Sequence, residues 1–213
     1  MIVSDVMTTN VVTIPSSTSL ADARRILDAH RFRRLPVVDR GKLVGIVTKD
    51  ALDRTGPSQM TTFSMHEISY LLNKITVVEA MRREVVTVSP NATVEEAVAL
   101  AQHKKVGALV VIEGDKIVGI VTTNDSFYKV LNPILGIDTP GSRIVVRGCH
   151  KGPDVEKAIA AINSTGLEIT TLFTIEFPEV GKHDLVVHLA SSDCTPACEA
   201  VRKLGFTIEE RGR

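Results

Sequence analysis

Two groups of charged side chains in this sequence have the types and spacing to bind a small ligand. Arg33 and Arg34 are adjacent, and a guanidinium group presents a fixed fork of donors that suits a phosphate. Asp125 follows Thr122 by three residues at the end of an apolar run. A carboxylate there can accept hydrogen bonds that its charge strengthens.

Each group also has an explanation that needs no ligand. A threonine followed three residues later by an acid, as in Thr122 and Asp125, is typical of a helix capping box. The two arginines can belong to a solvated basic face. That face would include Arg24, Arg25 and Arg31. The residues alone leave both alternatives open.

The C-terminal third contains thiols and imidazoles that could be imagined as a metal site. They are Cys149, His150, His183, His188, Cys194 and Cys198. Cys194 and Cys198 lie one helical turn apart, but small cysteines packed against a sheet are commoner than metal ligands. We therefore expect no metal. The sequence has no Walker loop, G-x-G-x-x-G segment, metalloprotease motif or nucleophile–base pair, so we expect no catalytic residue and no enzyme.

The elements that carry Thr122 and Asp125 belong to an internal repeat. The phrase KLVGIVT at Lys42 returns as KIVGIVT at Lys116, 74 residues later, and the match extends back to Met7 and Met81. Each copy predicts a β-α-β-β-α unit. The predicted strands are Val11–Ile14, Leu35–Val38 and Leu43–Val47, and Val85–Val88, Leu109–Ile112 and Ile117–Val121. Two such units can cover each other's sheets by packing face to face.

The remaining segments complete an α/β (α+β) chain. We expect repeats at 1–54 and 76–131, a connecting helix at 55–75, a linker at 132–142 and a third domain at 143–213. The linker is predicted from two prolines and two glycines. The third domain has the pattern βαββαβ, which is the ferredoxin-like arrangement.

The repeated motif VMTTNVVTIP…RRLPVVDRGKLVGIVT resembles paired cystathionine-β-synthase (CBS) domains, the Bateman module, over about Ile2–Leu131. The connector GPSQMTTFSMHEISYLLNKITVVEAM resembles the acetoin-utilisation (AcuB) subgroup, and the third domain is similar to an ACT domain. The resemblance implies a homodimer that binds an adenosine derivative such as AMP, ATP or S-adenosylmethionine as a regulatory ligand, without an obligatory cofactor. An ACT-like domain could add dimer contacts or an amino-acid site.

The resemblance also implies which residues hold the adenosine ligand. Asp125 would accept hydrogen bonds from both ribose hydroxyls, and Arg33 and Arg34 would face the phosphate. The adenine would lie against residues 10–12 and under Ile120. The expected binding residues are Asn10, Val11, Val12, Arg33, Arg34, Ile120, Thr122, Asn124 and Asp125.

The first repeat departs from this pattern. Ala51 stands where Asp125 stands in the second copy, and Asp50 precedes it by one residue, a rotation of about 100° on a helix. Gly107 and Ala108 replace the two arginines. We therefore expect one competent nucleotide site per chain.

Composition bounds the other functions. Lys and Arg number 25, as do Asp and Glu, and aromatic residues make up 4%, which argues against nucleic acid and anionic membranes as partners. Three cysteines and no signal-peptide pattern predict a cytoplasmic protein. The alternatives to a ligand sensor are a scaffold with empty clefts and an accessory protein or enzyme of acetoin metabolism.

Overall fold

The computed structural model describes residues 1–55, 64–137, 139–177 and 182–212. The chain forms two compact units, Met1–Ser126 and Phe127–Arg213. The first unit contains both repeats.

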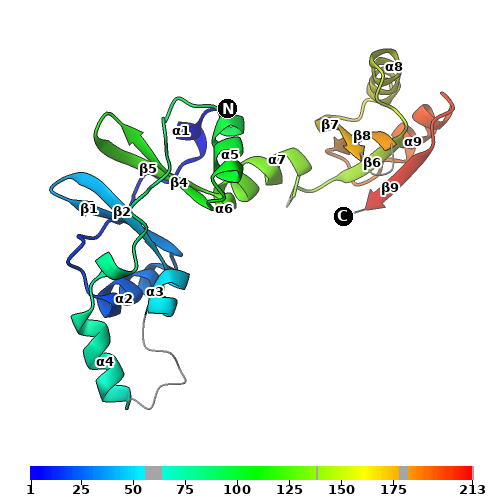
Figure 1. Ribbon diagram of the computed structural model, residues 1–213. Helices are drawn as coiled ribbons and strands as arrows, with labels where there is room; N and C mark the ends of the chain where they lie inside the picture. Colours follow the sequence, from blue (N-terminus) through cyan, green and yellow to red (C-terminus); the bar gives the residue numbers. More distant parts are fainter. Residues whose placement is uncertain (56–63, 138, 178–181, 213) are drawn as a thin grey trace. The chain divides into compact units, whose positions relative to one another are not determined.

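The first repeat is a two-stranded antiparallel hairpin with two helices, residues 20–30 and 49–55, on one side, whereas its short first helix, residues 3–6, lies beside the second repeat (Figure 1). Its elements are α1 (Val3–Val6), α2 (Leu20–His30), β1 (Arg34–Asp39), β2 (Lys42–Thr48) and α3 (Lys49–Thr55). The Ser19 hydroxyl caps α2 by accepting a hydrogen bond from the Asp22 amide at 3.0 Å. Leu27 of α2 packs with Leu35 and Val47 of the hairpin in a buried core.

The second repeat has the same hairpin and one more strand. After the connector helix α4 (Met65–Lys74), its elements are the 3₁₀ helix η1 (Val77–Glu79), β3 (Thr87–Val88), α5 (Val94–His103), β4 (Ala108–Glu113), β5 (Lys116–Thr122) and α6 (Thr123–Asp125). Ala108 pairs with Thr122 here, as Arg34 pairs with Thr48 in the first hairpin. The duplication seen in the sequence is therefore kept in the strand register. Helix α4 lies within the predicted connector, of which residues 56–63 lie outside the described part.

The predicted strand at Val11–Ile14 is wrong, because only Ile14 forms a bridge, to Val37. Proline explains the difference between the repeats. In the second repeat the Val110 amide donates to the Val86 carbonyl at 3.2 Å and extends the pairing of β3. The equivalent of Val110 is Pro36, which has no N–H to donate.

The edge strand of each hairpin pairs with a segment from the beginning of the other repeat. Thr8 exchanges backbone hydrogen bonds of 2.9 and 3.0 Å with Ile120 of β5, and Arg82 exchanges two bonds of 2.9 Å with Ile46 of β2. Gly119 on β5 permits this approach, since a Cβ there would lie 3.2 Å from the Thr8 carbonyl oxygen.

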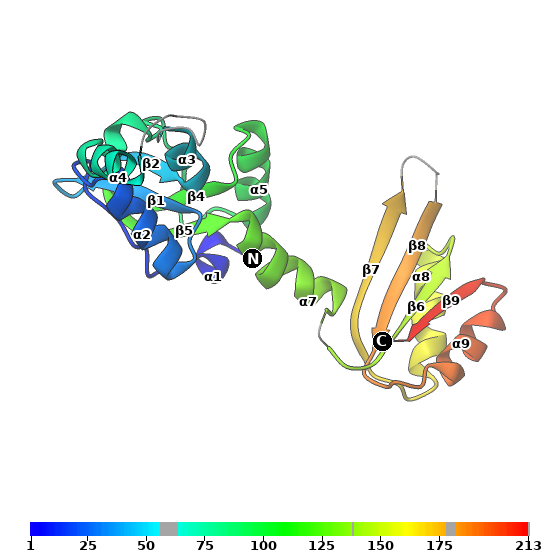
Figure 2. The same cartoon turned by 90° about the horizontal axis from the view of Figure 1, so that it is seen from below.

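The second unit is a four-stranded antiparallel sheet with two helices on one face (Figure 2). Its elements, after the π-helix η2 (Ser126–Leu131), are α7 (Asn132–Leu135), β6 (Ser142–Arg147), α8 (Gly152–Asn163), β7 (Ile169–Phe177), β8 (Lys182–Leu189), α9 (Thr195–Arg202) and β9 (Ile208–Gly212). The sheet order is β7-β8-β6-β9. From β6 onward, the chain follows the predicted order βαββαβ.

The segment predicted as a linker at 132–142 begins with a helix instead. Pro133 lies in the first turn of α7, where the missing N–H costs no helical hydrogen bond. Gly136 ends the helix in the left-handed conformation, with φ +57°. Proline and glycine here delimit a short helix, and composition alone does not distinguish this from a linker.

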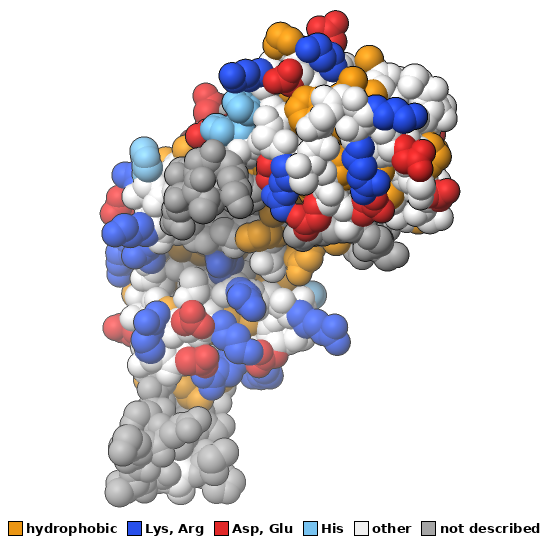
Figure 3. Space-filling view, turned by 90° about the vertical axis from the view of Figure 1, so that its right-hand side faces the viewer, with side chains coloured by type: hydrophobic (Ala, Val, Ile, Leu, Met, Phe, Trp, Pro, Cys, Tyr) orange, Lys and Arg blue, Asp and Glu red, His pale blue; other side chains and the backbone are white. Residues whose placement is uncertain are grey.

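Figure 3 shows charged side chains of both signs on the face that it draws. Among the described residues, no helix has the length and apolar character needed to cross a membrane.

Candidate functional site

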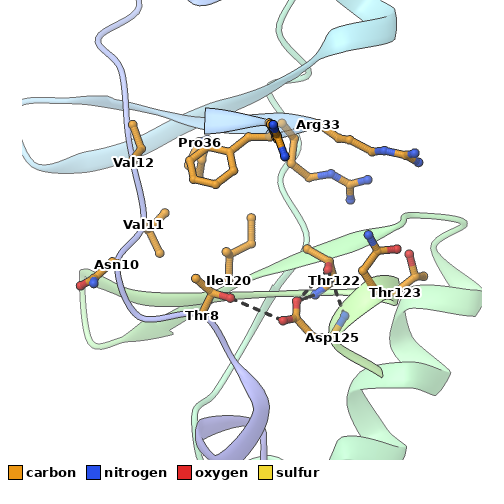
Figure 4. A pocket seen from close by; sticks show the side chains of 14 residues that line it. Thr8, Asn10, Val11, Val12, Arg33, Pro36, Ile120, Thr122, Thr123 and Asp125 are labelled. Atoms are coloured by element: carbon orange, nitrogen blue, oxygen red, sulfur yellow. Dashed lines mark hydrogen bonds between the residues drawn. The ribbon is translucent and has the colours of Figure 1, made fainter. Parts of the chain in front are cut away.

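A cavity of about 270 Å³ lies between the two repeats, near the lower end of the range of small-molecule sites, about 300–1,000 Å³. Figure 4 shows Arg33 and Pro36 of the first repeat across the cavity from Thr122 and Asp125 of the second. All nine residues expected from the sequence line this cavity. The five lining residues that sequence reasoning missed are Thr8, Arg31, Phe32, Pro36 and Thr123.

The Asp125 carboxylate both caps a helix and lines the cavity. Its Oδ2 accepts hydrogen bonds from the Thr122 amide at 2.9 Å and from the Thr122 hydroxyl at 2.7 Å, which completes a capping box on α6 (Figure 4). Its Oδ1 accepts from the Thr8 hydroxyl at 3.4 Å. Asp125 therefore does cap α6, as the capping-box pattern predicted. The cap uses Oδ2, whereas Oδ1 lies on the side of Thr8.

The arginines of the cavity differ from those of α2. Arg24 is ion-paired with Asp53, and Arg25 with Asp22 at 2.6 Å. In the described part of the chain, no carboxylate forms an ion pair with the three guanidinium groups that line the cavity. These belong to Arg31, Arg33 and Arg34. The basic face is thus divided into a neutralised part on α2 and a part with excess positive charge at the cavity.

Arg34 is half-buried, and this desolvation lowers the pKa of its guanidinium group. The neighbouring Arg33 charge lowers the pKa further, whereas the Asp50 charge raises it. The guanidinium group also lies against the second repeat, because a Cβ on Gly107 would be 3.2 Å from Arg34 Nη2. A bound anion would offset the electrostatic cost of holding this cation there.

The equivalent residues of the first repeat are arranged differently. The Thr48 hydroxyl accepts a hydrogen bond from the Ala51 amide at 3.2 Å, so a helix cap exists without a carboxylate. Asp50 does not line the cavity that contains Asp125. It lines a neighbouring cavity with Lys49 and Asp28. The shifted aspartate therefore does not replace the one missing at Ala51.

The imagined metal ligands of the second unit do not gather in one place: His150 stacks on His183 with 4.4 Å between the ring centroids, and Cys194 and Cys198 lie together elsewhere. Cys194, Cys198 and Glu210 have ligand atoms within 4.8 Å of one another, and no other such cluster of three occurs within the described ranges. Burial and a hydrogen bond with Cys194 raise the pKa of Cys198 to about 12, so its thiol is protonated at neutral pH. The absence of a metal stays a prediction, which elemental analysis for zinc would test.

The comparisons with known proteins identify the repeats. The CBS domain family matches residues 3–55 and 77–125. A crystal structure of a putative acetoin utilization protein (AcuB) from Vibrio cholerae is 30% identical, with a TM-score of 0.53, and the match covers 65% of this chain and 95% of that one. This chain belongs to the CBS-domain family. Its two repeats form a CBS pair.

Other relatives place CBS pairs in different contexts. The structure of CBSX2 in complex with AMP is 28% identical, with a TM-score of 0.50, and the match covers 62% of this chain and 97% of that one. Inosine-5'-monophosphate dehydrogenase of Korarchaeum cryptofilum is 29% identical over 70% of this chain. This chain spans only 28% of the length of that enzyme. The family match ends at residue 125, so it does not extend to the second unit.

Proposed function

We propose that this protein is a regulatory ligand sensor whose CBS pair binds one adenine nucleotide per chain. The observation that carries the proposal is the cavity between the repeats. It combines the Asp125 carboxylate with three arginines that form no ion pair with an acidic side chain among the described residues. The AMP complex of the related CBSX2 supports an adenine nucleotide as the class of ligand.

Each part of the nucleotide has a corresponding group in the cavity. Asp125 Oδ1 would accept from the ribose hydroxyls while Oδ2 keeps the helix cap. Arg33 and Arg34 would bind the phosphate. The half-buried side chains of Val11 and Ile120 would flank the adenine. The arginines favour a nucleotide over S-adenosylmethionine, whose sulfonium group is cationic.

In the proposed sensor, the second unit is the domain through which nucleotide binding affects the rest of the protein. Its βαββαβ order supports an ACT-type domain that dimerises or binds an amino acid, and the match to the Vibrio cholerae protein supports the AcuB subgroup. Helix α6, which Asp125 caps, continues into η2 and α7 at the start of this unit. We propose a cytoplasmic homodimer without catalytic activity, in which the nucleotide acts through its difference in affinity between two states.

Calorimetry with AMP tests the nucleotide site. We expect one site per chain, and a loss of about tenfold or more in affinity in Asp125→Ala, because a charge-assisted hydrogen bond contributes about 1.5–3 kcal/mol. The double variant Arg33→Ala, Arg34→Ala should lower the affinity for AMP much more than the affinity for adenosine. Saturating AMP should raise the melting temperature of the wild type but not of Asp125→Ala.

Glu96→Ala is the matched control for the lost helix cap. Glu96 completes a capping box on α5, where its carboxylate accepts from the Thr93 amide at 2.8 Å, and it does not line the cavity. The variant Glu96→Ala should lose about 0.5–2 kcal/mol of stability, as Asp125→Ala does, but should keep the wild-type affinity for AMP. Two equivalent sites would contradict the single-site proposal. No binding at all would favour the scaffold, and turnover of AMP would favour an enzyme.

A further inference from the structure

A second cavity adjoins the proposed nucleotide site on the other side of the arginine segment. It has a volume of about 640 Å³ and shares residues 31–34 with the first cavity. Its remaining lining residues are Leu27, Asp28, Thr48, Lys49 and Asp50. A phosphate held by Arg33 and Arg34 would therefore lie at the boundary between the two cavities, and a longer phosphate chain would extend toward the second.

The charges that line the second cavity differ from those of the first. Lys49 and Asp28 neutralise each other through an ion pair of 2.6 Å. Asp50 is exposed, and it has no ion pair or side-chain hydrogen bond with any residue in the described part of the chain. Its charge nevertheless acts on the Arg34 guanidinium group. Beyond the arginines, the uncompensated charge of the second cavity is thus negative.

The first cavity alone matches the charge of a single phosphate group. Three arginines and one aspartate line it, which leaves two positive charges in excess. A phosphate monoester carries about two negative charges at neutral pH. Each further phosphate would add negative charge without a further arginine and would bring that charge toward Asp50. Like charges brought together at a binding site reduce affinity and reject the wrong ligand.

We propose that this site selects nucleoside monophosphates over nucleoside di- and triphosphates, and that Asp50 is the residue that determines the selection. The inference rests on the proposed nucleotide site. It assigns a role to the aspartate that stands one position early in the first repeat: Asp50 faces the arginines from the side opposite to the ribose.

The test compares the affinities of AMP, ADP and ATP for the full-length wild type and for Asp50→Asn. It is done at low ionic strength and without divalent cations, because salt and Mg²⁺ would screen the charges. The wild type should bind AMP more tightly than ADP, and ADP more tightly than ATP. In Asp50→Asn the ratio of AMP affinity to ATP affinity should fall by about fivefold, mainly through tighter ATP binding.

Asp115→Asn is the control for charge removed elsewhere. Asp115 is exposed in the turn between β4 and β5 and lines neither cavity. Its substitution changes the net charge equally and should leave the ratio unchanged.

The outcomes separate this inference from the proposed function. If AMP binds through Asp125 but ATP binds as tightly, or if Asp50→Asn leaves the ratio unchanged, the selection by Asp50 is refuted and the nucleotide site stands. If no nucleotide binds the wild type, both are refuted.

Discussion

At the scale of single residues, buried groups of the second unit give the protein a titration that is separate from ligand binding. Cys198 is fully buried on α9 beside Ala197 and Val201. Burial raises the pKa of its thiol from 9.0 to about 12. Above pH 9 the unfolded chain therefore loses this proton before the folded chain does.

We expect this thiol to make stability fall in alkaline solution. The contribution of the Cys198 thiol to the free energy of unfolding is complete below pH 9, the pKa of the thiol in the unfolded chain. It is lost as pH rises toward about 12, the pKa of the thiol in the folded chain. In urea unfolding, the stability difference between wild type and Cys198→Ala should therefore shrink over this range. The difference between wild type and Val201→Ala, a buried residue without a proton to lose, should stay constant.

The residues of the cavity show how far sequence reasoning reaches at this scale. The nine expected residues could be named because the repeated motif resembles paired CBS domains, and that resemblance implies which positions hold the ligand. Thr8 could not, since it reaches Asp125 through backbone pairing with Ile120, a contact between distant parts of the chain. The sequence also could not decide between cap and ligand for Asp125, because the two oxygens of one carboxylate have different surroundings.

At the scale of elements, strand pairing depends on single backbone groups. Most predicted helices and strands are present, because hydrophobic periodicity specifies them. The strand at Val11–Ile14 is absent because Pro36 lacks one N–H, and the helix at Asn132–Leu135 was missed because proline and glycine delimit it. These errors occur where one or two residues outweigh the pattern of their segment.

The paired glycines Gly119 and Gly45 allow a matched experiment on the elements. A Cβ on Gly119 would clash with Met7 and displace the Thr8 segment from β5, whereas a Cβ on Gly45 would press on Met81, 2.6 Å from its sulfur. Both alanine variants should lose about 1–3 kcal/mol of stability through overpacking. Only Gly119→Ala should lower the affinity for AMP, by roughly fivefold. Equal AMP affinities in the two variants would show that the Thr8 segment does not shape the site.

At the scale of the whole molecule, the order of elements in the second unit could be predicted, but its role could not. Alternation and helical periodicity indicated βαββαβ, and the sheet order β7-β8-β6-β9 agrees with the ferredoxin-like arrangement. Many functions share this arrangement. The contacts between copies of the chain also depend on surface shape, which periodicity does not describe.

We expect a homodimer, and the exposed apolar residues after Asp125 are one candidate surface for it. The exposed fractions are 56% for Phe127, 67% for Tyr128, 37% for Leu131 and 45% for Ile134. Such a row is commonly covered by a partner. Light scattering at micromolar concentration should show a dimer for wild type and a smaller average mass for Leu131→Glu. The control is Leu204→Glu, at a leucine that is 44% exposed elsewhere. A wild-type protein that is monomeric at this concentration would refute the expected homodimer.

The exchange of segments between the repeats makes each half of the CBS pair dependent on the other. The first half supplies Thr8 to β5, and the second half supplies Arg82 to β2. A single cut between α3 and α4 would leave two fragments, each with an edge strand whose partner lies on the other fragment. The pair is therefore suited to fragment complementation, in which two separately made halves regain structure only when mixed.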